Sequence, residues 1–177
     1  MAKKRKIVVV PYDRRWPAMY RSAAGQLASL LGPELISIHH IGSTSIPGLS
    51  AKPIIDIMPV VRNINRVDRF DLALIGLGYK PLGENGIPGR RYFFKGGDLN
   101  QTHHVHMYEP DNPEVARHLD FRDYLAAHPQ QARQYAQLKE QLARQFPYDI
   151  DAYIAGKAGF INETIDQAHR GRCTLLP

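Results

Sequence analysis

Hydrophobic residues recur at helical spacing between residues 16 and 31, and this pattern predicts a first helix. The recurring positions include Trp16, Tyr20, Leu27 and Leu31. Pro17 stands where a first helical turn tolerates proline, and the Gly32-Pro33 pair is a strong stop signal. We expect this helix to pack on a sheet.

Short apolar segments around this helix predict strands. Ile7–Val10 is a candidate edge strand that ends at Pro11. The isoleucines of residues 36–41 predict a second strand, and Ile54–Met58 predicts a third, buried one. That buried strand carries Asp56, and a buried carboxylate is costly unless it is paired or holds a cation.

The middle of the chain predicts a helix followed by a hairpin. Asn65 is the expected N-cap of a helix whose buried positions are Val67, Phe70, Leu74 and Leu77. Arg90–Lys95 and Thr102–Tyr108 then read as antiparallel strands joined at Gly96-Gly97-Asp98. Strand alternation places His104 and His106 on one face, where they either share a ligand or form structural hydrogen bonds.

The remainder of the chain predicts three helices. Asn112 with Pro113 begins the first, His128-Pro129 separates it from the second, and Asp149 caps the third. In the third helix we expect the following residues to be buried: Ile150, Ile154, Ala158, Ile161 and Ile165. Without internal repeats or a low-complexity linker, residues 1–177 are expected to form a single domain. It comprises an α+β core (1–110) and a C-terminal helical segment (111–177).

Composition narrows the functional class only slightly. The chain is 44% hydrophobic and 23% charged, as in ordinary globular proteins, with a net charge of +6. That charge either favours anionic partners or only sets solubility. The sole cysteine, Cys173, excludes an intramolecular disulfide. No apolar run reaches the roughly 20 residues that span a bilayer, so we expect a cytoplasmic protein without a membrane partner.

The stretch between the second and third strands carries the candidate chemistry. Gly42 permits a positive φ or a close approach to the backbone. Ser43 and Thr44 follow it with hydroxyl and N–H groups that suit a phosphate. Asp56 comes about a dozen residues later, on the next strand. This order predicts that a phosphate and a metal ion meet at adjacent strand ends.

These residues resemble a known family. The runs HIGSTSIPGL (His40–Leu49) and AKPIID (Ala51–Asp56) resemble the GrpB family, a branch of the nucleotidyltransferase fold. The pairs Tyr135 with Lys139 and Tyr153 with Lys157 are similar to that family's C-terminal half. The resemblance implies a mixed sheet flanked by helices, and a later strand that completes the metal site. In this chain, histidines would replace the acid of that strand.

One residue departs from the usual nucleotidyltransferase pattern. The fold usually carries a second acid two residues after the first, where this chain has Met58. A thioether does not bind Mg²⁺, which requires oxygen ligands. We therefore expect one divalent ion (Mn²⁺, Mg²⁺ or Zn²⁺) held by Asp56, His104 and His106, with Asp56 as the catalytic residue.

Three functions remain open at this stage. The first is an enzyme that transfers or hydrolyses a phosphoryl or nucleotidyl group of a nucleotide or another phosphorylated small molecule. The second is a non-catalytic phosphate-binding module with a cationic surround that includes Arg90. A nucleic-acid binder is disfavoured, because basic and aromatic residues do not interleave on one strand. The candidate phosphate- or nucleotide-binding residues are Gly42, Ser43, Thr44, Lys52, Arg91, Lys139 and Lys157. The lysines alternatively extend past apolar surface to water.

Overall fold

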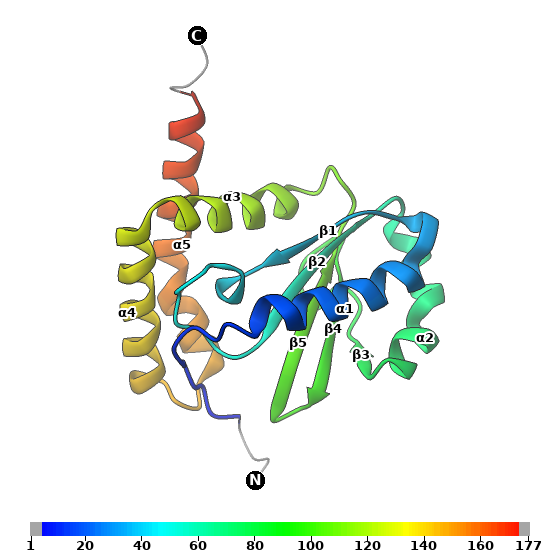
Figure 1. Cartoon of the computed structure of the whole chain (residues 1–177), viewed down its shortest axis with the longest axis horizontal. Helices are drawn as coiled ribbons and strands as arrows, with labels where there is room; N and C mark the ends of the chain where they lie inside the picture. The colour runs from blue at the N-terminus through cyan, green and yellow to red at the C-terminus, as the bar shows by residue number, and fades with distance from the viewer. Residues whose placement is uncertain (1–4, 174–177) are drawn as a thin grey trace.

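The computed structural model describes residues 5–173 and contains a five-stranded sheet in the order β1-β2-β5-β4-β3 (Figure 1). The strands are β1 (Leu35–Ile41), β2 (Ile55–Val61), β3 (Tyr79–Pro81), β4 (Arg91–Gly97) and β5 (Asn100–Met107). β2 and β5 are parallel, and the other neighbouring pairs are antiparallel. The predicted mixed sheet is therefore confirmed, including the pairing of the two strands that flank Gly42.

The two faces of the sheet have different characters. Helix α1 (Trp16–Leu31) lies across one face, where Ile55 and Ile57 of β2 join its buried residues in the main core (Figure 1). Because side chains alternate along a strand, Asp56 and Met58 point to the other face. The sequence alternation thus separates an apolar face, which holds the core, from a face that carries polar chemistry.

A 3₁₀ segment, η3 (Ile64–Phe70), leads into the short helix α2 (Asp71–Gly76). The cap lies two residues before the predicted Asn65, because the side chain of Asn63 accepts a hydrogen bond from the N–H of Asn65. Two further 3₁₀ turns are η1 (Gly32–Glu34) and η2 (Ser43–Ser45). Strand β3 was not predicted, because its three residues are too few for a periodic pattern.

The C-terminal part forms α3 (Pro113–Ala127), α4 (Pro129–Gln145) and α5 (Ile150–Cys173), which stand together at one end of the sheet (Figure 1). Asn112 and Asp149 accept hydrogen bonds from the N–H groups of Glu114 and Ala152, as predicted for caps. A second core joins these helices to the loop after β1 through Ile46 and Leu49. In residues 5–173, no helix is long and apolar enough to cross a membrane.

The N-terminal apolar segment does not join the sheet as a strand. Val10 makes one isolated bridge with Ala51, and Ile7 donates its N–H to the carbonyl oxygen of Pro147. Ile7 is buried with Leu142 and Tyr153 of the helical segment. The hydrophobicity of Ile7–Val10 therefore serves contacts between the N-terminus and the helices, and the prediction of an edge strand is wrong.

Candidate functional site

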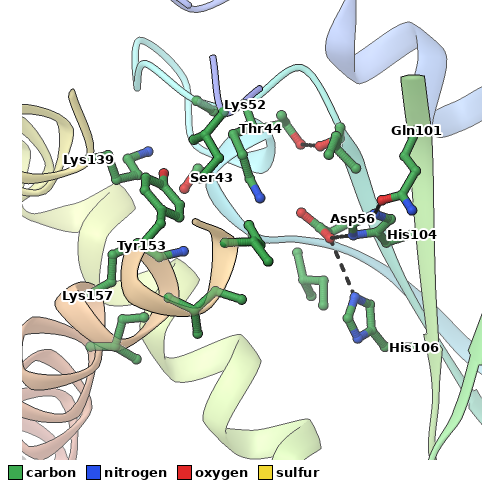
Figure 2. Close-up of a pocket in the computed structure, with 18 of the residues that line it drawn as sticks. Ser43, Thr44, Lys52, Asp56, Gln101, His104, His106, Lys139, Tyr153 and Lys157 are labelled. Atoms are coloured by element: carbon green, nitrogen blue, oxygen red, sulfur yellow. Dashed lines mark hydrogen bonds and ion pairs between the residues drawn. The ribbon is translucent and has the colours of Figure 1, made fainter. Parts of the chain in front are cut away.

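A cavity of about 970 Å³ separates the polar face of the sheet from the C-terminal helices (Figure 2). Asp56, His104 and His106 line its sheet side, while Lys139 and Lys157 line the side formed by the helices. Its volume and mixed lining are typical of a small-molecule site. The structure thus gathers into one cavity side chains that lie a hundred residues apart in the sequence.

Gly42 and Asp56 meet closely at the mouth of the turn after β1. Gly42 has φ 67° and ψ −174°, a backbone conformation essentially restricted to glycine. A Cβ atom at this position would lie 2.6 Å from Oδ2 of Asp56. Glycine is therefore required here both for the backbone conformation and for the space that the carboxylate occupies.

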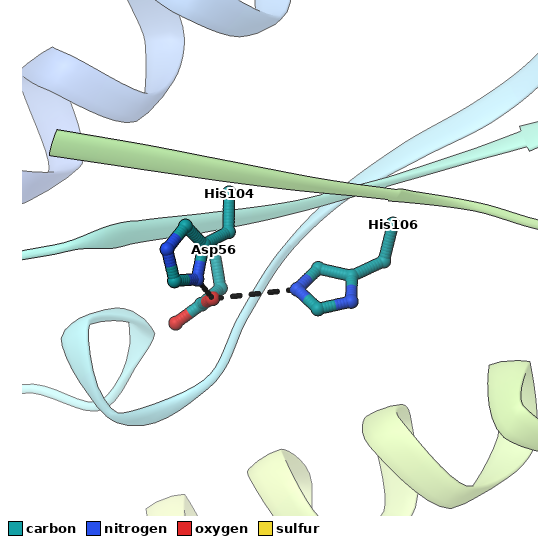
Figure 3. Close-up of side chains that lie close together, drawn as sticks. All are labelled: Asp56, His104 and His106. Atoms are coloured by element: carbon teal, nitrogen blue, oxygen red, sulfur yellow. Dashed lines mark hydrogen bonds and ion pairs between the residues drawn. The ribbon is translucent and has the colours of Figure 1, made fainter. Parts of the chain in front are cut away.

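Strand register brings Asp56 to the two histidines. Asp56 pairs with His104 across β2 and β5, and His106 follows two residues later on the same face. Oδ1 of Asp56 lies 3.4 Å from Nδ1 of His104 and 3.4 Å from Nε2 of His106 (Figure 3). Burial opposes ionisation of Asp56, but hydrogen bonds to both imidazoles outweigh it and hold its pKa well below the usual range.

The hydrogen bonds around His104 leave one ring nitrogen available for a ligand. Nε2 of His104 lies 2.9 Å from Oε1 of Gln101, which also accepts a hydrogen bond of 2.5 Å from Arg5. Because arginine only donates, that oxygen is an acceptor and Nε2 carries the proton. Nδ1 then faces the carboxylate of Asp56, to which it donates when the ring carries a second proton, and a cation between the two atoms would take the place of that proton. Gln101 and Arg5 act as outer partners that orient the ring.

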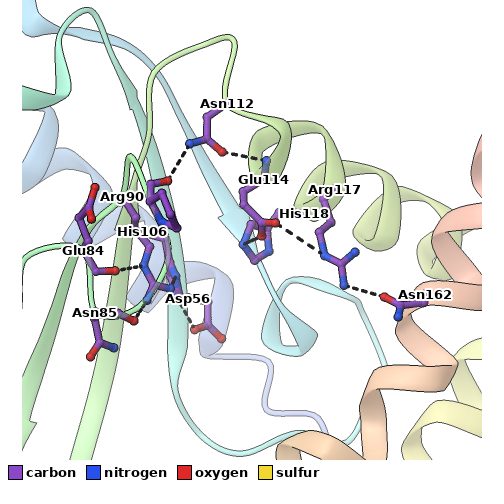
Figure 4. Close-up of polar contacts among 11 residues, drawn as sticks. Asp56, Glu84, Asn85, Arg90, His106, Asn112, Glu114, Arg117, His118 and Asn162 are labelled. Atoms are coloured by element: carbon purple, nitrogen blue, oxygen red, sulfur yellow. Dashed lines mark hydrogen bonds and ion pairs between the residues drawn. The ribbon is translucent and has the colours of Figure 1, made fainter.

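His106 has the opposite arrangement. Nη1 of Arg90 lies 3.4 Å from Nδ1 of His106, while the rest of its guanidinium donates to the carbonyl oxygens of Glu84 and Asn85 (Figure 4). A neutral His106 that accepts from Arg90 carries its proton on Nε2, which faces Asp56. To bind a metal through Nε2, His106 must move this proton to Nδ1 and release Arg90. His104 is therefore the readier ligand of the two.

His118 of α3 completes this side of the cavity. Its ring lies 5.7 Å from that of His106, measured between centroids, and Figure 4 shows it beside Arg90 and His106. Burial, and then the neighbouring His106, lower the pKa of His118 to about 4, so its ring is neutral at neutral pH. Neither His118 nor Gln101 was predicted from sequence, since each is an isolated polar residue without a recognisable spacing.

Three lysines lie across the cavity from Asp56 (Figure 2). The Nζ atoms of Lys52 and Lys157 lie 5.4 and 4.5 Å from the ring centroid of Tyr153, and that of Lys139 lies 4.7 Å from the ring of Tyr135. Lys139 also donates to the carbonyl oxygen of Ser50. These three residues, the lysine cluster, therefore place one buried and two half-buried ammonium-bearing side chains around one part of the cavity.

Burial and mutual repulsion disfavour the charged forms of these lysines. Burial, followed by the charge of Lys157, lowers the pKa of Lys139 to about 7. Burial and then Lys52 lower the pKa of Lys157 to about 8. An anion bound among these groups would relieve the repulsion, so the cluster suits a phosphate.

Two of the predicted phosphate-binding residues have other contacts. The hydroxyl of Thr44 is buried, donates to the carbonyl oxygen of Ile54 and contacts His40, which leaves only its N–H for a ligand. Arg91 is not among the residues that line the cavity, and pairs instead with Asp68 at 2.5 Å. Arg90 lines the cavity instead of Arg91. Strand alternation places Arg90 on the same face as Tyr92, and Tyr92 pairs with His106.

The turn at Ser43 remains in position for an anion. Ser43 lines the cavity together with Tyr135. The N–H groups of Ser43 and Thr44 begin the η2 turn, where helical N–H groups have no partner within the helix. Among the predicted phosphate-binding residues, the cavity is lined by Gly42, Ser43, Thr44, Lys52, Lys139 and Lys157.

The sheet and its flanking helices define a protein of the nucleotidyltransferase fold. The solved structure of terminal uridylyl transferase 4 from Trypanosoma brucei, with bound dUTP, matches with a TM-score of 0.55. The match covers 92% of this chain and 55% of that one at 12% sequence identity. At this identity the likeness concerns the fold alone.

The chain belongs to the GrpB family, whose model, described as GrpB protein, matches residues 6–167. The crystal structure of conserved protein GrpB from Enterococcus faecalis is 40% identical, with a TM-score of 0.89 over 93% of this chain and 99% of that one. UPF0157 protein YqkA from Bacillus subtilis is 52% identical over 167 residues, which are 94% of this chain. The match spans only 48% of YqkA, about half its length. The predicted family is confirmed.

Replacing Gly42 by alanine tests the contact with Asp56. We expect Gly42→Ala to lower the free energy of unfolding by about 1–3 kcal/mol, because alanine is strained at this φ and ψ. Its Cβ would also displace the carboxylate of Asp56. Gly48→Ala is the matched control, since Gly48 has φ 80° with nothing within 4 Å. Urea unfolding that shows no greater loss for Gly42→Ala than for Gly48→Ala would contradict the close contact.

The lowered pKa of Lys139 predicts a pH dependence of stability. An unfolded lysine titrates near pH 10.4, so between pH 7 and 10 the unfolded chain binds more protons than the folded one. Stability contributed by this site should therefore rise with pH across that window. Urea unfolding at pH 7 and pH 9 should show a smaller rise for Lys139→Met than for the wild type. Lys80→Met, on the exposed surface, is the control and should behave as the wild type; an equal rise in all three proteins would refute the assignment.

Proposed function

We propose that this protein binds a nucleotide or another phosphorylated small molecule in the cavity, and transfers or hydrolyses its phosphoryl or nucleotidyl group with one divalent metal ion. The observation that carries the proposal is the pairing of Asp56 with Nδ1 of His104, 3.4 Å apart, in the same cavity as three lysines. An oxygen and nitrogen donor set thus lies in one cavity with a cationic cluster.

The donor set fits one metal ion. Asp56, His104 and His106 each offer a ligand atom, and these atoms lie within 4.8 Å of one another. Two imidazoles and one carboxylate suit Mn²⁺ or Zn²⁺ better than Mg²⁺, which prefers oxygen. When bound, such an ion would polarise a phosphoryl oxygen or lower the pKa of a water molecule.

The residues that the structure describes do not provide a second metal site. Met58 is fully buried with Ile41 and Tyr108, so its position contributes to the core. Glu109 accepts a hydrogen bond from the N–H of Ile64, outside the cluster at Asp56. In the described part of the chain, Asp56, His104 and His106 form the only acid and histidine cluster of metal-binding geometry. We therefore propose one-metal chemistry and not the usual two-metal transfer.

The protein's own groups would bind and orient the phosphate. Lys52, Lys139 and Lys157 would neutralise its charge, while the N–H groups of Ser43 and Thr44 would orient its oxygens. Arg90 and the neutral His118 lie beside His106 and would line the part of the cavity in which the phosphate reacts. The helices α4 and α5 supply two of the lysines, and so would close the site over the ligand.

A second candidate is a phosphate-binding module without catalysis. Met58 favours it by removing the second carboxylate, and Arg90 favours it by holding His106 in the tautomer that donates to Asp56. In this case the histidines serve to keep Asp56 ionised, and the lysines alone define the function.

Metal reloading decides between the two functions. After treatment with a chelator, the wild type should take up one equivalent of Mn²⁺ or Zn²⁺. Asp56→Asn and His104→Ala should each bind at least about tenfold more weakly, equivalent to 1.4 kcal/mol or more. His103→Ala is the matched control, because His103 lies on the same strand with its side chain on the other face.

The expected pattern in calorimetry and elemental analysis is therefore normal uptake by His103→Ala and weakened uptake by the other two variants. An absence of stoichiometric metal in the reloaded wild type, or equal uptake by all four proteins, would favour the non-catalytic module.

A further inference from the structure

One face of α5 runs along the cavity for most of its length. Residues spaced three and four positions apart share a helix face. The residues of this stripe that line the cavity are Ile150, Ile154, Lys157, Ile161 and Ile165. Lys157, from the lysine cluster, therefore lies in the middle of an otherwise apolar stripe. The periodic isoleucines of the sequence form this stripe.

The two halves of the stripe differ in burial. Ile165 is buried and Ile161 packs against the helical core. In contrast, Ile150 is 36% exposed and Ile154 is 53% exposed, and neither belongs to a core cluster of the described residues. The prediction that both are buried in the core is therefore wrong. Both isoleucines line the cavity, as does Tyr148, which is 54% exposed.

We propose that the ligand of this cavity is amphipathic: a phosphate bound at the lysine cluster bears an aliphatic or aryl group that packs on Ile150, Ile154 and Tyr148. This inference rests on the proposed phosphate site and specifies the class of molecule that it takes. Three uncovered apolar side chains within a binding cavity lose contact with water when such a group binds. A ligand that is polar throughout would leave these three side chains exposed to water.

The helix geometry sets the size of the apolar group. Ile154 precedes Lys157 by three residues and Ile150 precedes it by seven, which correspond to about 4.5 and 10 Å along the helix axis. A group of about four carbon atoms attached to a phosphate at Lys157 would therefore reach Ile154, and one of about eight would reach Ile150 as well. The cavity of about 970 Å³ accommodates this extension in addition to the phosphate.

A series of alkyl phosphates tests this inference. Titration calorimetry on the metal-free protein would compare inorganic phosphate with methyl, ethyl, propyl and butyl phosphate. Each buried methylene should tighten binding about fourfold, so butyl phosphate should bind tens of times more tightly than methyl phosphate. The Ile150→Ser/Ile154→Ser double variant should lose this dependence on chain length and bind inorganic phosphate as the wild type does.

Leu72→Ser is the matched control, because Leu72 is an exposed apolar helical residue away from the cavity. It should retain the full dependence on chain length. Phosphate binding without such a dependence in the wild type, or an unchanged dependence in the double variant, would overturn the inference and leave the phosphate site intact. Failure of every phosphate to bind would contradict the proposed function as well. A dimer that dissociates in the double variant would also overturn the inference, because a second copy would then cover these residues.

Discussion

The parallel pairing of β2 with β5 is the constraint on which the rest of the site depends. Its register sets Asp56 opposite His104 and, through strand alternation, places His106 on the same face. The same alternation turns Ile55 and Ile57 into the core beneath α1. A slip by one residue would bury the carboxylate against that helix and expose the isoleucines, so the core that stabilises the sheet also fixes the site.

Around this register, the cavity has two electrostatically opposite ends. Asp56 stays ionised because the two histidines compensate for its burial, whereas the buried Lys139 and the half-buried Lys157 disfavour each other's charge. When these lysines are charged, they repel one another and lower the stability of the fold. The arrangement therefore favours the binding of an anion over stability. Such a cost is typical of functional sites. The apolar stripe on α5 connects this cluster to the exposed Ile150 and Ile154, and the cavity thus combines an acidic, a basic and an apolar environment.

Sequence patterns predicted the features that depend on neighbouring residues. Alternation placed His104 and His106 together, and cap residues such as Asn112 marked helix starts. Features that depend on tertiary contacts were not predictable in this way. Arg91 pairs with Asp68 while Arg90 lines the cavity, a choice set by the register of β4 against β5. Periodicity identified the helix face that carries Ile154, but it could not show whether that face packs against protein or lines a cavity.

The proposed chemistry requires that Asp56 and His104 hold a divalent ion facing a phosphate on the lysine cluster. A crystal soaked with Mn²⁺ and a non-hydrolysable nucleotide, recorded at a wavelength where manganese scatters anomalously, tests it directly. We predict one anomalous peak about 2.1 Å from Nδ1 of His104 and from a carboxylate oxygen of Asp56, with phosphate density beside Lys157. Phosphate density at the lysines with no anomalous peak at Asp56, or a peak bound elsewhere, would contradict the claim.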